Sequence, residues 1–146
     1  MINDAYPYYP SKGNMQFVFQ SEGEQGKVMK MIQFTRLKNG EWNLGFGDWK
    51  KGTVDDLTVT NNHDAIRVIK TVAKATLDFF ETYPGSVLVI KGSDDRRRRL
   101  YNYIFQKHFE DISLSFTIIG IIDEIEDYYS PLKFYHFFKI SLKFGL

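Results

Sequence analysis

The sequence of 146 residues contains no cysteine, which excludes disulfides, thiol catalysis and thiolate metal sites. Its formal net charge is only +1, so any binding of nucleic acid must come from a local basic patch and not from a global field. No apolar run reaches the roughly 20 residues of a membrane-spanning helix. Residues 1–6 are neither basic nor followed by an apolar core, so we expect no signal peptide, no membrane partner and a cytoplasmic location.

The chain also lacks the usual motifs of catalysis. No nucleophile elbow, dinucleotide fingerprint or P-loop ending is present. The histidines have no ligand-like spacing, so we expect no metal site; they are His63, His108 and His136. We therefore expect no cofactor, and the sequence favours a non-catalytic protein without excluding an enzyme.

Apolar and aromatic residues are abundant, at 43% and 16% of the chain, which is typical of a folded protein. A chain of this length supports one sizeable core, so we expect a single domain over residues 1–146. Residues 1–13 contain Pro7, Pro10 and Gly13 and are expected to form an irregular N-terminal arm.

The first part of the chain alternates apolar and polar residues in three stretches, at 15–21, 27–37 and 41–46. This alternation predicts an antiparallel meander, with Asn39-Gly40 as the strongest hairpin signal. A fourth, short strand is expected at 57–60. Further alternation predicts strands at 112–118 and 133–144, with an acidic loop or helical turn at 123–127.

Two helices are predicted, over 62–83 and 94–109. Asn61 can cap the first, and an apolar stripe at helical spacing is expected to face the sheet: Ile66, Ile69, Ala73, Leu77 and Phe80. The inward row of the second helix is expected to be Leu100, Ile104 and His108. Together these elements predict an α+β fold, a mainly antiparallel sheet of roughly five to seven strands with two main helices packed on it.

The strongest candidate site is the junction between the apolar strand 87–90 and the arginine-rich start of the second helix. A strand, a Gly-Ser turn and a helix N-terminus with basic side chains could bind a phosphate or carboxylate. Alternatively, the arginines pair with nearby carboxylates such as Asp94 and Asp95 in a structural network. The candidate binding residues are Lys91, Gly92, Ser93, Arg96, Arg97, Arg99 and Tyr101.

The same residues carry a resemblance. Gly92-Ser93, followed by Arg97, Arg99 and Leu100-Tyr101, resembles the G-S-x-x-x-R-x-R-L-Y motif of a family of small uncharacterised bacterial proteins common in Bacteroidetes. The likeness extends over most of the chain to about residue 120. No activity is established for that family, so the resemblance implies a bacterial source and no catalytic residue.

A possible secondary face lies in the stretch 133–144, where lysines alternate with aromatic residues. Tyr135, Phe137 and Lys139 share one side of this predicted strand, as a platform for single-stranded nucleic acid requires. The alternatives are an edge strand protected by lysines and a dimer contact.

The sequence therefore favours a protein that binds nucleic acid or a phosphate-bearing ligand through the basic strand-to-helix junction. The alternative is a non-catalytic module for protein–protein interaction or homo-oligomerisation, in which the arginines are structural.

Overall fold

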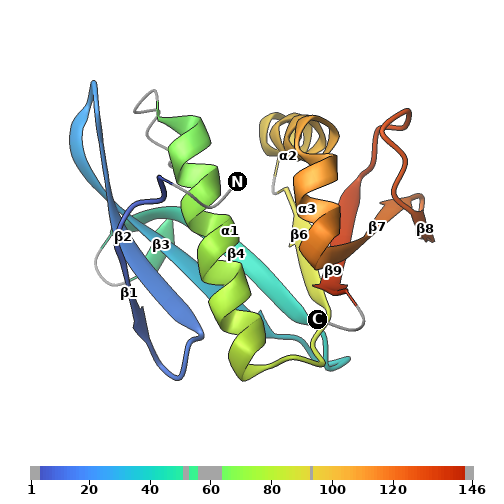
Figure 1. Ribbon diagram of the computed structural model, residues 1–146, viewed down its shortest axis with the longest axis horizontal. Helices are drawn as coiled ribbons and strands as arrows, with labels where there is room; N and C mark the ends of the chain where they lie inside the picture. Colours follow the sequence, from blue (N-terminus) through green and yellow to red (C-terminus); the bar gives the residue numbers. More distant parts are fainter. Residues whose placement is uncertain (1–3, 51–52, 56–63, 93, 144–146) are drawn as a thin grey trace. The chain divides into compact units, whose positions relative to one another are not determined.

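The computed structural model describes residues 4–50, 53–55, 64–92 and 94–143, and these residues contain nine strands and three helices (Figure 1). The chain divides into two compact units: residues 1–35 with 44–84, and residues 36–43 with 85–146. The architecture is α+β with mainly antiparallel strands, which confirms the predicted fold class. The strand count exceeds the expected five to seven because three short strands, Tyr8–Ser11, Thr53–Asp55 and Ile125–Tyr128, form where no strand was expected. That the chain is a single domain stays a prediction.

The first unit contains the predicted N-terminal meander. Its strands follow the order β1-β2-β3-β4, and β5 pairs with β4. The expected arm is regular in part, because residues 8–11 form a strand antiparallel to β2. The predicted strand at 57–60 and the cap at Asn61 lie outside the described residues. The bounds are β1 Tyr8–Ser11, β2 Gln16–Gly23, β3 Gly26–Arg36, β4 Trp42–Lys50 and β5 Thr53–Asp55.

The first predicted helix is α1, Ala65–Thr82, but its buried face differs from the expected stripe. Ile66 is exposed, whereas Thr71 and Thr76 are buried. Both threonine hydroxyls donate to the backbone carbonyl four residues earlier, at 2.8 Å, so neither leaves an unsatisfied polar group in the core. The ring of Phe79 stacks on Phe34 of β3 with centroids 4.2 Å apart. The buried positions are Val68, Thr71, Ala75, Thr76, Phe79 and Phe80.

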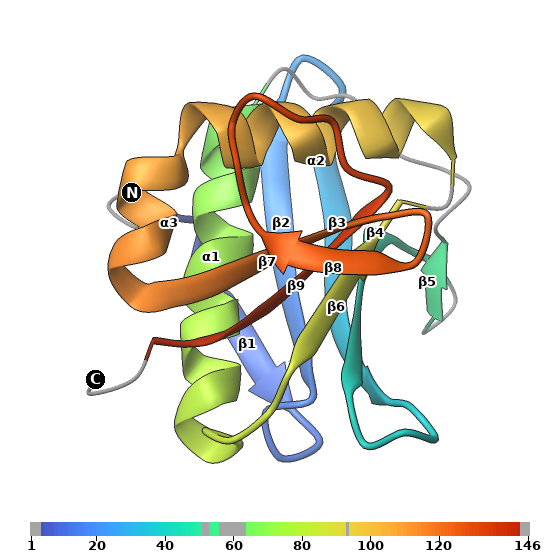
Figure 2. The same ribbon diagram turned by 90° about the vertical axis from the view of Figure 1, so that its right-hand side faces the viewer.

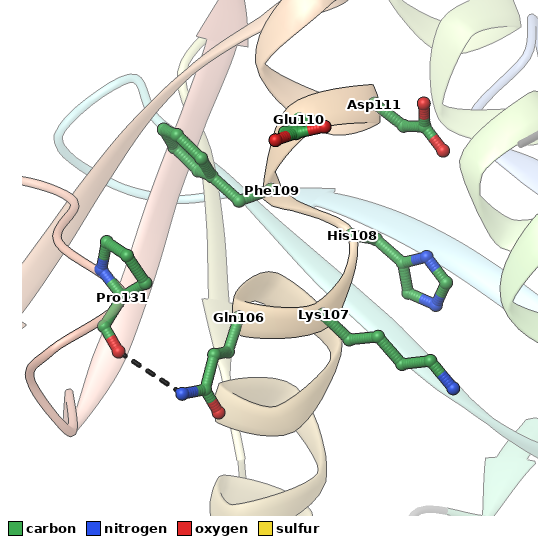
Figure 3. Close-up of a pocket in the computed structure, with 7 residues that line it drawn as sticks. All are labelled: Gln106, Lys107, His108, Phe109, Glu110, Asp111 and Pro131. Carbon is green, nitrogen blue, oxygen red and sulfur yellow. Dashed lines mark hydrogen bonds between the residues drawn. The ribbon is translucent and has the colours of Figure 1, made fainter.

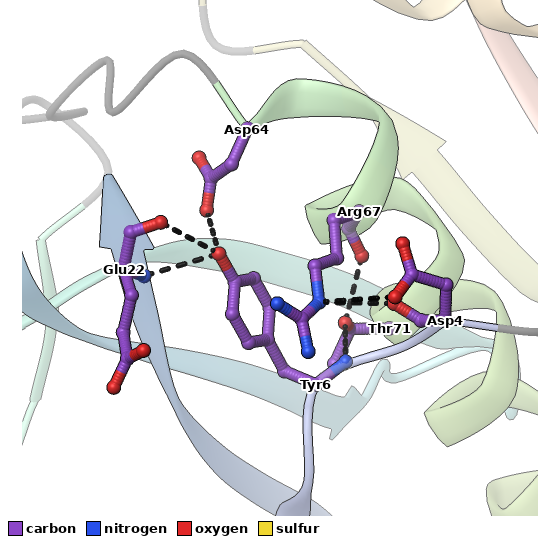
Figure 4. A network of polar contacts seen from close by, with 6 residues as sticks. All are labelled: Asp4, Tyr6, Glu22, Asp64, Arg67 and Thr71. Carbon is purple, nitrogen blue, oxygen red and sulfur yellow. Dashed lines mark hydrogen bonds and ion pairs between the residues drawn. The ribbon is translucent and has the colours of Figure 1, made fainter. Parts of the chain in front are cut away.

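Tyrosines tie the N-terminal segment to α1 (Figure 4). The backbone N–H of Tyr6 donates to the Thr71 hydroxyl at 2.9 Å, and its phenol donates to Asp64 at 2.5 Å. Asp64 precedes α1 without capping it, because its carboxylate accepts from Tyr6 and from Ser21 Oγ. The guanidinium of Arg67 lies over the Tyr6 ring, 4.0 Å from the centroid. Burial, followed by the bond to Asp64, raises the pKa of Tyr6.

An ion pair that the sequence did not predict lies inside the first unit. Lys30 Nζ contacts Asp48 Oδ1 at 2.7 Å, and the two side chains are only 2% and 3% exposed. Lys30 pairs with Phe19 across the β2–β3 ladder, so alternation places its charge on the apolar face. Removing one partner of such a pair typically costs about 3–5 kcal/mol, because the other charge remains buried.

The second unit is built on the strand order β4-β6-β9-β7-β8. The start of β4 pairs parallel with β6, through Trp42 and Leu88, and the remaining neighbours are antiparallel. Helix α2 lies beside these strands (Figure 2). Its Phe105 ring stacks on Phe138 of β9 with centroids 4.3 Å apart. The bounds are β6 Leu88–Lys91, α2 Asp95–Lys107, α3 Phe109–Ser115, β7 Phe116–Ile122, β8 Ile125–Tyr128 and β9 Phe137–Leu142.

Three predicted segments of this unit need correction. The stretch 112–118 begins in α3, because Glu110 and Asp111 in the first turn favour a helix start, and only then enters β7. The acidic stretch 123–127 is a hairpin, since Asp123 and Glu124 have φ values of 49° and 67° that suit a two-residue turn into β8. The predicted strand 133–144 is confined to 137–142.

The tyrosine contacts make stability fall at alkaline pH. Burial, followed by the hydrogen bond to Asp78, raises the pKa of Tyr8. The unfolded chain therefore loses the proton of the Tyr8 hydroxyl at a lower pH than the folded chain does. The resulting stabilisation is present below about pH 10 and is lost as the pH rises above it. In urea titrations from pH 8 to 11, we expect Tyr8→Phe to be about 1–3 kcal/mol less stable at pH 8 and to lose less stability than the wild type above pH 10. Tyr9→Phe, at an exposed position, is the control; equal pH slopes in wild type and Tyr8→Phe would contradict the assignment.

Candidate basic surface on helix α2

The start of α2 is closed by the protein's own carboxylate. Asp94 is the N-cap residue, and its Oδ1 accepts a hydrogen bond from the backbone N–H of Arg97 at 2.8 Å. Ser93 of the Gly-Ser turn lies outside the described residues. An external anion at this helix end would meet a negative side chain on an amide that is already bonded.

Gly92 has a steric role in the junction. A Cβ atom at this position would lie 2.7 Å from the backbone nitrogen of Arg98 and 3.1 Å from Cβ of Arg97. The first turn of α2 therefore passes too close to the strand end for any residue with a side chain. This close approach explains the glycine without a ligand.

The four arginines separate because successive helical residues are turned by about 100°. Arg97 is only 8% exposed, Arg98 is half-buried, and Arg96 and Arg99 are exposed. Arg98 Nη1 lies 3.8 Å from Asp95 Oδ1. Arg97 is therefore part of the packed side of α2 and is not available to a ligand, whereas Arg96 and Arg99 are.

The predicted inward row of α2 is also displaced. Leu100 is exposed, and the buried residues are Arg97, Asn102 and Phe105. Tyr101 is half-buried. The sequence alone favoured Leu100 because of its apolar side chain, but Asn102 is buried instead, where Nδ2 donates two hydrogen bonds and Oδ1 accepts one.

The exposed side of α2 carries cations around one aromatic ring. Arg96, Arg99, Tyr103 and Lys107 recur at spacings of three and four residues, which places them on one helical face, and all four are exposed. Lys107 Nζ donates to the Tyr103 hydroxyl at 3.2 Å. Within the described part of the chain, no carboxylate lies within ion-pair distance of Arg96 or Arg99.

The loop that leads into β9 runs beside this helix (Figure 2). Asn102 Nδ2 donates to the carbonyl of Tyr135 at 2.8 Å, and the N–H of Tyr135 donates to Asn102 Oδ1 at 2.7 Å. Gln106 Nε2 donates to the carbonyl of Pro131 at 3.3 Å. Between these anchors, Lys133 and Phe134 are exposed. We call the combined region the α2 surface, and it consists of Arg96, Arg99, Tyr103, Lys107, Lys133 and Phe134.

Tyr135 does not contribute a free aromatic face. Its side chain is 1% exposed, and its hydroxyl accepts the N–H of Ser130 at 2.8 Å. Its ring lies against Gly120 of β7, where an added Cβ would come within 2.2 Å of the ring. The expectation that Tyr135 presents its ring to a ligand is therefore wrong, because the strand begins only at 137 and Tyr135, two residues earlier, has its ring in the core.

Lys91 joins Phe137 and Lys139 on the other face of this unit's sheet. Lys91 pairs with Phe137 across β6 and β9, with Nζ 5.5 Å from the ring centroid. Lys139 Nζ contacts carboxylates of Glu126 at 2.6 Å and Glu41 at 3.0 Å. The bond to Glu126, with that to Glu41, raises the pKa of Lys139 despite partial burial. This face therefore has no excess of positive charge at Lys139.

A pocket of about 300 Å³ lies where α2 passes into α3 (Figure 3). Lys107, His108 and Asp111 point to one side, whereas Gln106 points to the other, toward Pro131. The polar groups thus diverge, unlike those of a site built to orient a small molecule. Lys107 belongs to both this pocket and the α2 surface.

Sequence reasoning found Arg96 and Arg99 but missed four members of the α2 surface. The spacing of Tyr103 and Lys107 from these arginines was available as a signal of one shared helical face. Lys133 and Phe134 had no such signal, because only the hydrogen bonds of Asn102 and Gln106 bring their loop to α2.

These features define an α+β protein, mainly antiparallel in its strands, with an exposed basic face on one helix. The chain belongs to a family of unknown function, DUF6934, whose model matches residues 3–143. This membership agrees with the resemblance to an uncharacterised family, while the bacterial source stays a prediction. A search of curated proteins and a search of solved structures each found no match.

Two further findings apply to the described residues alone. None of their helices combines the length and the apolar character that crossing a membrane requires. No group of three or more histidine, aspartate or glutamate side chains among them is placed to hold a metal ion.

Asn102 should be much more important for stability than Gln106, although both bond the same loop. Asn102→Ala leaves the buried N–H and carbonyl of Tyr135 without partners, which we expect to cost about 2–5 kcal/mol. Gln106→Ala removes one long, exposed bond and should cost less than about 1 kcal/mol. Urea denaturation measures both values, and equal losses would contradict the anchoring role of Asn102.

Proposed function

We propose that this protein binds a nucleic acid through the α2 surface. The observation that carries the proposal is the row of exposed cations on α2, Arg96, Arg99 and Lys107, beside which the anchored loop adds Lys133. Asp95 is the one carboxylate on the exposed arc of the helix, and its partner is Arg98. A local excess of positive charge attracts a polyanion even when the net charge of the whole chain is close to zero.

The geometry favours a polymer over a single phosphate. Lys107 lies eleven positions after Arg96, which corresponds to about 17 Å along a helix. One phosphate is held by donors that converge on it, as in a bidentate arginine site. Cations spread along such a length instead match a chain of phosphates, each of which exchanges a condensed counterion for a protein charge.

The proposal moves the site away from the junction suggested by the sequence. Asp94 already occupies the helix start, Gly92 serves backbone packing and Arg97 is buried. Lys91 belongs to the opposite sheet face with Phe137. A cytoplasmic location, which the sequence predicts, would give the α2 surface access to RNA and DNA.

Neutralising two cations of the α2 surface should weaken binding and its salt dependence. For Arg96→Gln/Arg99→Gln, we expect at least about a tenfold loss of affinity at low salt. The slope of log K against log salt should become shallower by about 1.4 for a single strand or 1.8 for a duplex, because two phosphate contacts are lost. Fluorescence polarisation with labelled single-stranded DNA, RNA and duplex, at 50–200 mM salt, measures both quantities.

The matched control removes the same charge elsewhere. Lys27→Gln/Lys38→Gln changes two exposed lysines outside α2 and should leave affinity and slope nearly unchanged. Circular dichroism and urea titration verify that both variants fold. An equal loss in the two variants would make the attraction non-local and refute the proposal, as would the absence of binding to all three ligands.

The edge strand β8 supports a second candidate, a protein–protein interaction module. All four of its residues are exposed, and Ile125 and Tyr128 present large apolar side chains. Glu126 and Asp127 would lie opposite like charges if two copies paired antiparallel, so a basic partner strand fits better than a second copy.

This candidate makes a measurable prediction about self-association. Sedimentation velocity at about 10–100 μM should show a monomer, because the acidic centre of β8 opposes pairing between copies. Glu126→Lys/Asp127→Lys should not create a dimer with itself, but mixed with the wild type it should favour a heterodimer, because opposite charges then face one another. A stable wild-type dimer that Tyr128→Lys disrupts would contradict this charge argument.

A further inference from the structure

We infer that the nucleic acid bound by the α2 surface is single-stranded and that its bases stack on Tyr103 and Phe134. This inference rests on the proposed function and adds the class of ligand to it. Each of the two side chains is 51% exposed. Tyr103 lies among the cations of α2, and Phe134 follows Lys133 in the loop that is bonded to α2. Flat rings interleaved with positive charge are the combination by which proteins bind unpaired strands without sequence preference.

Tyr103 lies within the row of cations. Arg99 precedes it by one helical turn and Lys107 follows it by one turn, on the same face. Lys107 Nζ is 3.2 Å from its hydroxyl and 5.5 Å from its ring centroid, so the cation lies against the ring. A strand whose phosphates follow the cations would therefore bring its bases to this ring.

Phe134 is exposed on a loop that is fixed from both sides. The following residue, Tyr135, is held by two hydrogen bonds to Asn102 and has its ring in the core. Pro131 is bonded to Gln106 on the next turn of α2. Because the backbone around the ring is already ordered, stacking a base on Phe134 costs little additional conformational entropy.

The same loop argues against a duplex. A recognition helix with its side chains is about 10–12 Å wide and fills a major groove about 12 Å wide. On α2, the loop is bonded to Asn102 and Gln106 along one flank, so helix and loop together are wider than the groove. A single strand has no groove, and its unpaired bases are free to reach the rings.

The decisive test removes the ring and the bases separately. We expect Phe134→Leu to bind a labelled oligothymidylate about 5- to 150-fold more weakly than the wild type, because stacking is lost although an apolar side chain remains. The salt slope should not change, because the substitution removes no charge. Phe134→Trp keeps an aromatic ring and should bind about as tightly as the wild type. An abasic strand of equal length should bind wild type and Phe134→Leu equally, since it has no bases to stack.

The control variant is Tyr9→Leu, which removes an exposed ring outside the α2 surface and should leave binding unchanged. If wild type binds a duplex as tightly as the single strand, or if Phe134→Leu binds oligothymidylate normally, the stacking inference is wrong while the charge-based proposal stands. If Phe134→Leu instead converts a dimer into a monomer without changing affinity, Phe134 is a contact between copies and the inference is also wrong. Failure of all strands to bind refutes the proposed function and the inference with it.

Discussion

The paired hydrogen bonds between the Asn102 amide and the backbone of Tyr135 are the constraint on which the second unit's surface depends. They satisfy the backbone N–H and carbonyl of Tyr135, which lies just outside β9. They also direct the Tyr135 ring onto Gly120 of β7, where a side chain would leave no room for the ring. Because the buried ring fixes the backbone, Phe134 is held beside α2 with its own ring exposed. One core contact thus determines what the protein presents to solvent.

The same burial decides which arginines face solvent. Asn102 and Phe105 must face inward for α2 to contact both the loop and β9, and this fixes the rotation of the helix. At about 100° per residue, Arg97 then falls on the packed side, while Arg96 and Arg99 fall on the exposed side. The structural interpretation of the arginine run therefore fits Arg97, whereas the proposed binding uses only Arg96 and Arg99.

The parts predicted correctly from the sequence depend on local signals. Alternation and turn residues such as Asn39-Gly40 act within a few positions, so the meander and the existence of both main helices follow from them. The buried faces of the helices were missed because Thr71 and Asn102 are buried polar residues whose hydrogen bonds satisfy them. The helix α3 was missed because its short pattern fits a half-exposed helix as well as a strand. Lys30 in the core likewise depends on Asp48, which lies 18 residues later.

Charge pairing distinguishes the arginine-rich helix from the secondary face of Phe137 and Lys139 that the sequence also suggested. Lys139 is balanced by two carboxylates, Glu126 of β8 and Glu41 just before β4, so an incoming phosphate would have to displace bonds of 2.6 and 3.0 Å. Arg96 and Arg99 form no ion pair with a carboxylate in the part of the chain that the structure describes. A net charge of +1 for the chain hides this difference, because most of the acidic residues that enter the sum lie away from α2, several of them on the β7–β8 hairpin. Since screening limits such interactions to about 10 Å at 0.1 M salt, the local excess on α2 decides what this surface attracts.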